Sequence, residues 1–366
     1  MVSGNDPIKV CFVCPKVYPI FDSACAEVFG GAEVDLYNLG TELAKDPAFD
    51  VSFVAADYGQ PAQMHAEGVT LIRGLDFKRG PLAGALKLWQ AMKQADAEIY
   101  MLKTVSMGVP LVAWFCRHYG KAFVYRTASA LESNGQYVHR HRTMGKLFLW
   151  SLKRADLIFT QNQVDCDNLM STSHLRSVMV RNGHRLEAAQ NGRRDSVLWV
   201  GRSDPVKGPQ KFIELARRTP CERFVMICQR ATGDASYGGL VQQAEEIGNL
   251  TFIERVPFHQ TDAYFQAARV LVNTSDSEGF SNTFIQACRW AVPILSLNVN
   301  PDDFLNRWSC GICCHSDENR LAQGLRALLE SDRYVEIGQN ARKYAEANHD
   351  ITKIVDVYKE LFRKLV

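Results

Sequence analysis

Short apolar runs alternate along the first half of the chain with segments whose apolar residues recur at helical spacing. The first run, Ile8 to Cys14, is typical of a buried strand in a parallel sheet. Gly30-Gly31-Ala32-Glu33 then opens an apolar-periodic segment, which predicts a strand, a glycine turn and a helix. Leu82 to Met92 has the same helical spacing. Further strand-like runs are Val51 to Ala55, Ile99 to Leu102, Ala122 to Tyr125 and Leu157 to Thr160. This alternation predicts a parallel sheet covered by helices.

A polar stretch, Asn182 to Ser196, interrupts the pattern with Gly183, Asn191-Gly192 and Arg193-Arg194 and is typical of a linker. Strand-like runs then resume at Val197 to Val200, Phe224 to Cys228, Leu250 to Ile253, Val270 to Asn273 and Pro293 to Leu297. Helical segments follow at Pro209 to Arg217, Ser281 to Trp290, Glu318 to Leu329 and Glu336 to Leu365. We therefore predict the α/β class with two facing Rossmann-like domains, residues 1–188 and 189–347. Residues 348–366 are expected to cross back and pack on the N-terminal domain.

Composition limits the class of protein. The 366 residues are 46% hydrophobic and 22% charged, which suits two cores of ordinary domain size. No run approaches the roughly 20 apolar residues of a spanning helix, and the start MVSGNDPIKVCFV lacks a secretory leader, so we expect a cytoplasmic protein. The 11 cysteines are expected to be reduced. Cys11-x-x-Cys14 lies in a strand-like run and Cys310-x-x-Cys313-Cys314-His315 has no second zinc knuckle, which favours core or loop thiols.

The net charge of +2 hides an uneven distribution. Residues 78–154 hold thirteen Lys and Arg against three acids, Asp96, Glu98 and Glu132, so this segment carries +10 and the remainder −8. A positive surface on the first half attracts anionic phosphates or an anionic bilayer. Solvated side chains without any partner explain the same count, and both interpretations stay open.

Two loops carry candidate chemistry. Gly201-Arg202-Ser203-Asp204-Pro205-Val206-Lys207-Gly208 lies where a strand ends and a helix begins, a place where free N–H groups and the cations Arg202 and Lys207 can bind a diphosphate. Ser275 to Thr283 has the same position after a later strand. The alternative for both loops is ordinary turn and cap chemistry.

The second loop supplies several kinds of ligand contact. Gly279 permits close backbone approach, and Glu278 can accept hydrogen bonds from sugar hydroxyls. The amides of Phe280, Ser281, Asn282 and Thr283 form an anion-binding edge, with Ser281 or Asn282 as the N-cap. Gln286 is expected on the same side of the helix, one to two turns further on.

The combination of these loops resembles glycosyltransferase family 4, whose fold is the two-domain GT-B type. Gly30-Gly31-Ala32-Glu33 is similar to the first glycine loop of that family, Asn182-Gly183 to its pre-linker turn, and Lys353 to Val366 to its final crossover helix. The resemblance implies that Arg202 and Lys207 neutralise the donor diphosphate and that Glu278 holds the transferred sugar. It also implies that no metal or other cofactor is needed.

The resemblance assigns further residues to the donor. Gly201, Gly279 and the amides from Phe280 to Thr283 would approach the diphosphate, and Gly30 and Gly31 would close the cleft from the opposite domain. The turn from Arg255 through Val256 to Phe258 would frame the base.

Two positions depart from the family pattern. Gln286 stands where the second glutamate binds the ribose, and a neutral amide loses the charge-assisted hydrogen bond. Ala128 stands where many relatives place an active-site histidine. His139 and His141 are close in sequence, but nothing assigns either of them that role.

Acceptors of this family bind the first domain, where the positive charge lies. His139 to Trp150 combines basic residues with an apolar cluster, as an interfacial helix at an anionic lipid surface would. An ordinary core helix with Phe148, Leu149 and Leu152 buried is the competing interpretation. No nucleic-acid motif accompanies the charge.

The leading hypothesis is a retaining glycosyltransferase that moves a sugar from a nucleotide diphosphate, UDP-linked, to a glycan or lipid-linked acceptor in cell-surface polysaccharide or glycolipid synthesis. It would work in the cytoplasm, with peripheral association on the cytoplasmic face of an anionic membrane and without nucleic acid. Gln286 and Ala128 motivate a rival, a degenerate relative that binds a nucleotide sugar without catalysis. Another GT-B enzyme, such as a sugar-nucleotide epimerase or a glycan phosphorylase, is a further alternative.

Overall fold

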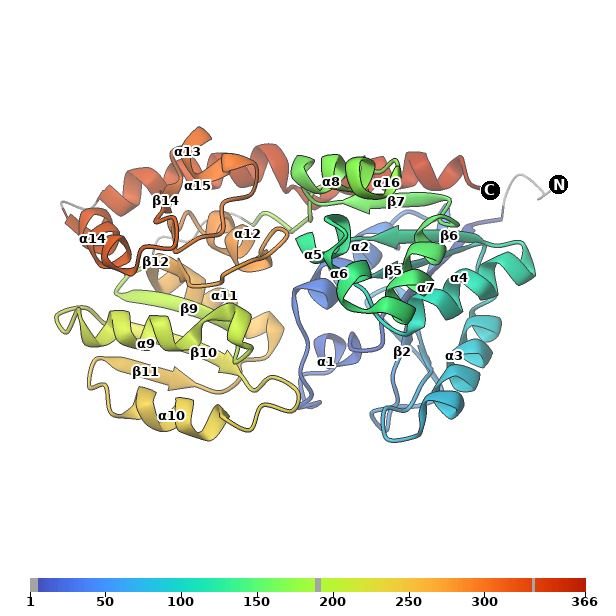
Figure 1. The fold of residues 1–366 in the computed structure, drawn as a ribbon, viewed down its shortest axis with the longest axis horizontal. Helices are drawn as coiled ribbons and strands as arrows, with labels where there is room; N and C mark the ends of the chain where they lie inside the picture. Colours follow the sequence, from blue (N-terminus) through green and yellow to red (C-terminus); the bar gives the residue numbers. More distant parts are fainter. Residues whose placement is uncertain (1–5, 188–191, 331–332) are drawn as a thin grey trace. The chain divides into compact units, whose positions relative to one another are not determined.

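The computed structural model describes residues 6–187, 192–330 and 333–366, which divide into two α/β units (Figure 1). Unit 1 comprises Met1–Arg185 with Ile351–Val366, and unit 2 comprises Leu186–Asp350. The boundary predicted between residues 188 and 189 lies outside the described residues, as does part of the predicted linker. The second division falls between Asp350 and Ile351 rather than between residues 347 and 348.

Unit 1 contains an eight-stranded sheet in the order β3-β4-β2-β1-β5-β6-β7-β8, in which every neighbouring pair is parallel except β3 with β4. Its strands are β1 (Ile8–Val13), β2 (Phe49–Ala55), β3 (Gln63–Ala66), β4 (Val69–Arg73), β5 (Ile99–Lys103), β6 (Ala122–Arg126), β7 (Leu157–Thr160) and β8 (Val178–Met179). The predicted apolar runs correspond to β1, β2, β5, β6 and β7. The edge strand β3 is largely exposed, so it has no apolar run to detect.

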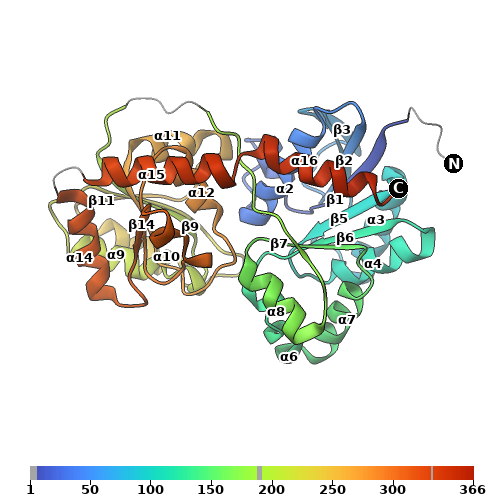
Figure 2. The same cartoon turned by 90° about the horizontal axis from the view of Figure 1, so that it is seen from above.

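Helices cover both faces of this sheet. α3, α4, α7 and α8 pack on one face through a core that includes Leu88, Val112 and Phe148. On the other face Phe159 of β7 contacts Tyr358 of α16, with ring centroids 4.6 Å apart, and Figure 2 shows α16 beside α2. The helices of unit 1 are α1 (Tyr18–Phe21), α2 (Gly31–Leu43), α3 (Pro81–Ala95), α4 (Gly108–Tyr119), α5 (Ala130–Ser133), α6 (Gln136–Arg140), α7 (Arg142–Leu152), α8 (Gln163–Ser173) and α16 (Ile351–Arg363).

Unit 2 contains a six-stranded, fully parallel sheet in the order β11-β10-β9-β12-β13-β14. The strands are β9 (Ser196–Arg202), β10 (Phe224–Gln229), β11 (Leu250–Ile253), β12 (Ala268–Asn273), β13 (Ile294–Ser296) and β14 (Gly311–Cys313). Both faces are covered, because such strands need apolar neighbours above and below.

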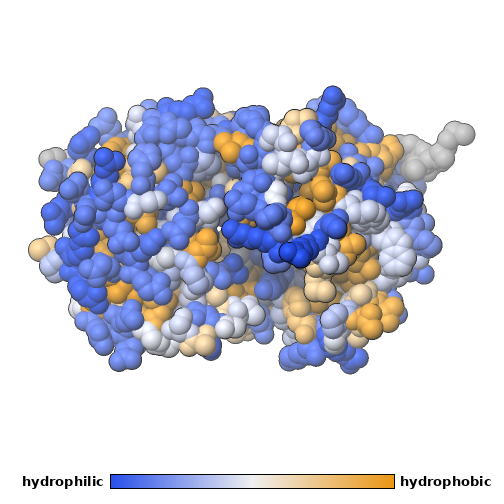
Figure 3. Space-filling view, viewed as in Figure 1, coloured by the Kyte–Doolittle hydropathy of each residue, from blue (hydrophilic) through white to orange (hydrophobic). Residues whose placement is uncertain are grey.

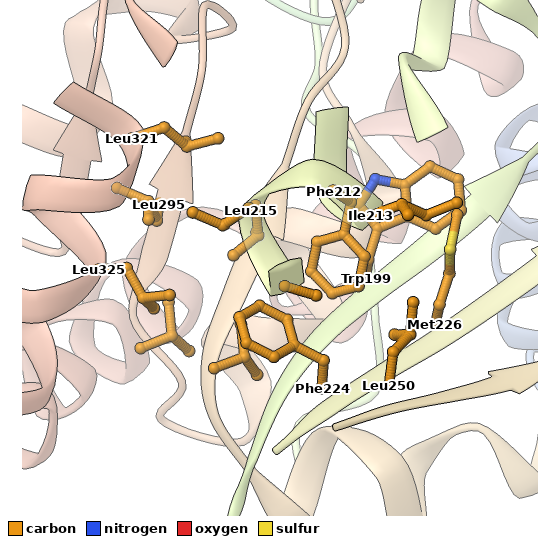
Figure 4. Packing of buried hydrophobic residues seen from close by; sticks show 14 of the residues in the cluster. Trp199, Phe212, Ile213, Leu215, Phe224, Met226, Leu250, Leu295, Leu321 and Leu325 are labelled. Carbon is orange, nitrogen blue, oxygen red and sulfur yellow. The ribbon is translucent and has the colours of Figure 1, made fainter. Parts of the chain in front are cut away.

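α9, α10 and α14 cover one face of the unit 2 sheet, over a core in which Trp199, Phe212 and Phe224 pack together (Figure 4). α11, α12, α13 and α15 supply the core on the other face. The helices of unit 2 are α9 (Pro209–Arg217), α10 (Tyr237–Glu245), α11 (Asp262–Ala267), α12 (Asn282–Arg289), α13 (Phe304–Arg307), α14 (Glu318–Leu329) and α15 (Arg333–Asn348), with short 3₁₀ turns η1 (Pro205–Lys207), η2 (Phe258–Gln260) and η3 (Pro301–Asp303).

The single helix predicted from Glu336 to Leu365 is wrong, because the chain forms α15 and α16 in its place. Between them the His349 ring is buried against Phe280, with centroids 4.9 Å apart, and Ile351 N donates to His184 O at 3.1 Å. Gly183 lies directly against Ile351 with no room for a Cβ. The apolar period continues across this break, so the sequence pattern does not reveal it.

The segment from His139 to Trp150 forms the end of α6 and most of α7. Phe148 and Leu152 are buried in the core of unit 1, and Leu149 is partly buried. This burial confirms the core-helix interpretation for these side chains. Within the described residues, no helix has both the length and the apolar character needed to cross a bilayer.

Candidate functional site

The strand order of unit 2 reverses between β9 and β12. β10 and β11 lie to one side of β9, and β13 and β14 lie on the far side of β12. The connections that leave these two strands therefore diverge, which leaves a crevice at their carboxyl ends where α/β proteins bind ligands. The two loops singled out by sequence, Gly201 to Gly208 and Ser275 to Thr283, are the connections that follow β9 and β12.

Direct contacts join the two loops into one site. Lys207 Nζ lies 2.8 Å from Glu278 Oε2. Thr274 Oγ1 donates to Lys207 O at 2.7 Å, and Asp276 N donates to Val206 O at 2.9 Å. One backbone bond and one side-chain bond hold the two loops together, which brings Lys207 and Glu278 within reach of each other.

Two glycines make this close approach possible. Gly208 has φ of +58°, and a Cβ there would lie 2.7 Å from Thr274 O, so the position admits only glycine without strain. A Cβ at Gly201 would lie 2.7 Å from the indole of Trp199, whose Nε1 donates to Thr274 Oγ1 at 2.9 Å. Gly201 therefore makes room for a tryptophan that positions the second loop, a role that the sequence did not reveal.

The Glu278 carboxylate is fixed by several donors. Its Oε1 accepts from Ser275 Oγ at 2.6 Å and from Asn273 Nδ2 at 2.9 Å, while Oε2 faces Lys207. Burial alone would raise the pKa of Glu278, but the charge of Lys207 and these hydrogen bonds hold that pKa below its ordinary value. The side chain is an ionised, oriented hydrogen-bond acceptor.

Arg202 ends β9 and is partly exposed. Its guanidinium lies 2.8 Å from Asp204 Oδ2 in the same loop. Both cations of the site are thus paired with carboxylates that the chain itself supplies, which keeps them at the crevice. A guanidinium has five donors, so this pairing leaves Arg202 able to form further bonds to an anion.

The start of α12 lies beside these charges. Gly279 and Phe280 are buried, and the Phe280 ring packs 5.1 Å from Phe304. Ser281 occupies the N-cap position, but its hydroxyl faces Thr283 Oγ1 at 2.9 Å and does not cap the helix. The first amides of α12, including that of Asn282, begin at the same crevice as Lys207 and Glu278.

Gln286 is buried on α12, and its Nε2 lies 3.4 Å from Thr261 Oγ1. Thr261 follows the turn that begins at Arg255, so the structure brings Gln286 next to the predicted base-framing segment. The Val256 side chain is buried in the core below that turn, which leaves its backbone as the available part.

In unit 1, Gly30 and Gly31 form the start of α2, where Gly30 N donates to Glu33 Oε2 at 2.8 Å. Ala128, at the position of the expected histidine, donates its N–H to Glu132 Oε2 at 3.1 Å. Glu132 also accepts from Tyr125 Oη at 2.7 Å. Burial raises the pKa of the Glu132 carboxyl. The same side chain joins the loops that follow β5 and β6.

A buried ionic cluster in unit 1 was not predicted. Asp35 Oδ2 accepts from Lys103 Nζ at 2.7 Å and from Arg126 Nε at 2.8 Å. Arg126 also donates to Asn182 Oδ1 at 2.7 Å and to the Tyr358 hydroxyl of α16. Lys103 and Arg126 are the last residues of otherwise apolar strands, and that position was the available signal.

This cluster lies where the strand order of unit 1 reverses, between β1 and β5. Burial lowers the pKa of Lys103 to about 8 despite the attraction of Asp35. Burial would raise the pKa of Asp35, but Arg126 and Lys103 hold it below its ordinary value. Among the residues that the structure describes, no group of three or more His, Cys, Asp or Glu is arranged to hold a metal ion.

Solved structures define the class of the fold. Sucrose-phosphate synthase from Thermosynechococcus elongatus has a TM-score of 0.79 with 18% identity and covers 98% of this chain and 99% of its own. A structure described as trehalose-6-phosphate from E. coli bound with UDP-2-fluoro glucose has a TM-score of 0.70 with 13% identity, over 98% and 99% of the two chains. The predicted GT-B fold is confirmed.

The family-model match covers most of unit 2. Residues 181–344 match the model of the family described as glycosyl transferases group 1, a range that contains every candidate donor residue of unit 2. The D-inositol 3-phosphate glycosyltransferase of Mycolicibacterium paratuberculosis is 31% identical over 110 residues, 29% of this chain and 25% of the relative. The matched segments span 25% to 35% of the curated relatives. Together with the structural neighbours, these matches support a GT-B glycosyltransferase.

Proposed function

We propose that this protein is a retaining glycosyltransferase of the family 4 type, which transfers a sugar from a nucleotide diphosphate donor. The observation that carries the proposal is the contact of 2.8 Å between Lys207 and Glu278, at the point where the strand order of unit 2 reverses. A cation and an ionised carboxylate lie side by side there. The donor has two parts that need opposite partners, an anionic diphosphate and a sugar rich in hydroxyl groups.

The diphosphate is proposed to bind Arg202, Lys207 and the first amides of α12. Departure of the nucleotide diphosphate leaves negative charge on its terminal phosphate. Two fixed cations and a helix start stabilise that charge where it develops, in the manner of an oxyanion hole. The chain supplies this compensation from its own side chains, and we propose that the reaction uses neither a metal nor another cofactor.

Glu278 is proposed to hold the transferred sugar. Its carboxylate is already oriented by Ser275 and Asn273, so a sugar hydroxyl can donate to it without further ordering of the side chain. When the diphosphate takes Lys207 as its partner, Oε2 becomes available to the sugar. Binding of the donor then exchanges one charge-assisted contact for two.

The nucleoside is proposed to bind between Gln286 and the turn at Arg255. The contact between Gln286 and Thr261 supports this placement, because it brings the amide close to that turn. We propose UDP as the nucleotide, and the E. coli neighbour bound with UDP-2-fluoro glucose supports this choice. An amide donates and accepts hydrogen bonds, so Gln286 is able to bind a ribose diol more weakly than a carboxylate would.

The acceptor is proposed to be a glycan or lipid-linked molecule that binds unit 1 on the cytoplasmic side of the membrane, in cell-surface polysaccharide or glycolipid synthesis. The thirteen Lys and Arg against three acids in residues 78–154 support an anionic acceptor such as a lipid-linked pyrophosphate.

Thermal denaturation with nucleotides in the presence of EDTA tests the donor site. UDP is expected to raise the apparent melting temperature of the wild type, because it binds the native state. The shift should be lost in Lys207→Ala and kept in Lys211→Ala, a lysine of α9 whose Nζ lies 2.7 Å from Asp276 in the second loop. If neither UDP nor GDP raises the apparent melting temperature of folded wild-type protein, the proposal is refuted.

A second experiment separates catalysis from binding. Gln286 and Ala128 favour a degenerate relative that binds a nucleotide sugar without turning it over. Incubation with UDP-sugars, followed by NMR of the products, distinguishes the candidates. Release of UDP together with a product that retains the anomeric configuration, whether by hydrolysis or by transfer, supports the retaining enzyme. An epimerised sugar supports the epimerase, and binding without any product supports the degenerate relative.

A further inference from the structure

Two neighbouring helices of unit 1 expose large apolar side chains. On α3, Leu82 is 84% exposed and Leu86 is exposed four residues later. Met107, which precedes α4, is 69% exposed, and Trp114 within α4 is 56% exposed. Most of the apolar surface of a folded protein consists of scattered single residues, whereas these lie on adjacent elements.

These residues form one outward face, which we call the α3–α4 face. Leu82 and Leu86 are exposed, whereas Leu88 and Met92, on another side of α3, fill the core. Trp89 joins the two helices, with its ring 5.1 Å from that of Trp114. Figure 3 shows apolar side chains gathered over α3.

The charge around this face is predominantly positive, although Asp76 precedes α3 and Asp96 follows it. The sequences of α3 and α4 contain no Asp or Glu. Lys78 precedes α3, and Lys93 and Arg117 lie near the carboxyl ends of the two helices, exposed to solvent. Lys93 Nζ lies 5.9 Å from the centre of the Tyr119 ring. Leucine and tryptophan side chains among basic residues complement an anionic lipid surface, where the apolar groups enter the acyl boundary and the cations meet the head groups.

The position of the face fits a surface role. α3 and α4 begin after β4 and β5, so Leu82 and Met107 lie towards the carboxyl edge of the unit 1 sheet. Gly30 and Glu132 follow β1 and β6 at the same edge, where an α/β unit binds ligands. A bilayer that covers this face would present the head groups of its lipids to that edge.

We propose that the α3–α4 face docks on an anionic bilayer. The segment from His139 to Trp150, considered for this role from the sequence, has Phe148 in the core and Trp150 partly buried against it, which leaves Leu147 as its exposed large apolar side chain. Docking rests on the proposed function, which places the acceptor at a membrane, and adds the surface of unit 1 that meets the bilayer. A second copy of the chain is the alternative occupant. A face that binds a second copy is expected to be shaped to fit it and not to be surrounded by an excess of positive charge.

Sedimentation of the full chain with vesicles tests the proposal. We expect binding to vesicles of phosphatidylcholine with about one third phosphatidylglycerol, and little binding to phosphatidylcholine alone. Raising NaCl from about 0.1 M to about 1 M should weaken binding, because the Debye length falls from about 10 Å to about 3 Å. Partition that is equal for the two kinds of vesicle would overturn the proposal.

Matched variants locate the surface. Leu82→Ser with Leu86→Ser should weaken partition by roughly ten-fold or more, and Lys78→Gln with Lys93→Gln by roughly five-fold per charge. The control Val335→Ser with Val357→Ser removes side chains that are 48% and 41% exposed on α15 and α16, and should bind as the wild type does. Equal loss in the control variant contradicts the assignment to this face.

Two further readouts separate this proposal from others. The thermal shift with UDP should be unchanged in the Leu82→Ser, Leu86→Ser variant, so failure of the donor site and failure of docking are seen independently. Analytical ultracentrifugation without lipid tests the alternative occupant. A dimer that dissociates in this variant, without preference for anionic vesicles in the wild type, would refute membrane docking.

Discussion

Asp35 contacts two buried cations, Lys103 and Arg126, and its replacement by asparagine tests how unit 1 is held together. The change keeps the size and shape of the side chain. It removes the charge that Lys103 Nζ and Arg126 Nε both contact, at 2.7 and 2.8 Å. All three side chains are buried, so water cannot take the place of the lost carboxylate.

Loss of one member of a buried ion pair costs about 3–5 kcal/mol of stability. In a domain of this size each kcal/mol lowers the melting temperature by about 2–4 °C, so a fall of roughly 6–20 °C is expected for unit 1. Asp46→Asn is the matched control, because Asp46 pairs with Lys359 of α16 at 3.2 Å in a more exposed position. That variant should lose about 1 kcal/mol or less.

The effect of Asp35→Asn should also depend on pH. The pKa of Lys103 is already lowered to about 8 by burial, and without Asp35 it falls further. The unfolded chain then binds more protons than the folded one across neutral pH, so the stability of the variant rises with pH. Calorimetry at about pH 6 and about pH 9 should therefore show the larger deficit at the lower pH.

A second substitution completes the test. Lys103→Met in the Asp35→Asn background removes the unpaired ammonium and should recover part of the lost stability, which a double-mutant cycle measures. If Asp35→Asn melts within a few degrees of the wild type at pH 6, or if Lys103→Met adds its own full cost to it, the cluster is not electrostatically coupled as described.

Three other predictions follow from the site and the core. Glu278→Gln should lower sugar transfer by at least roughly ten-fold, because a charged hydrogen bond to the transferred sugar is lost, while the thermal shift with UDP, which lacks that sugar, persists. Gly208→Ala should lower the free energy of unfolding by about 1 kcal/mol or more and weaken the UDP shift. Gly233→Ala is the control for backbone strain alone, because Gly233 has φ of +79° but an added Cβ there would have no atom within 4 Å. Burial raises the pKa of Cys228 and Cys310 to about 12. The folded state therefore keeps thiol protons that the unfolded state loses as pH rises from about 9 towards about 12. Urea denaturation under reducing conditions should show the free energy of unfolding falling over that range.

The strands were the most predictable part of the fold. Leu157–Thr160 and Leu250–Ile253 were expected within the residues that the structure gives, because a parallel strand buried on both faces is a continuous apolar run. The hairpin of β3 and β4 was not expected, since β3 alternates between exposed and partly exposed residues at the sheet edge. The break after Asn348 was missed because the apolar period continues through it.

The candidate site was predictable as two loops but not as one structure. Glycine and charge at the ends of strands identify each loop, whereas the contact between Lys207 and Glu278 depends on the strand order, which places β12 beside β9. The role of Gly201 depends on the indole of Trp199 and was equally hidden. Asp35, Lys103 and Arg126 lie far apart in sequence, so no local pattern joins them.

The α3–α4 face shows what periodicity leaves undecided. Leu82 to Met92 was predicted as a helix because its apolar residues recur at helical spacing, and α3 is a helix. The pattern gives no sign that Leu88 and Met92 face the core while Leu82 and Leu86 face solvent, because both pairs are apolar and each is spaced by four residues. A helix that is apolar on two sides needs a second apolar partner. Because α3 and α4 contain no acidic residues, we expect that partner to be anionic as well as apolar. An anionic bilayer has both properties.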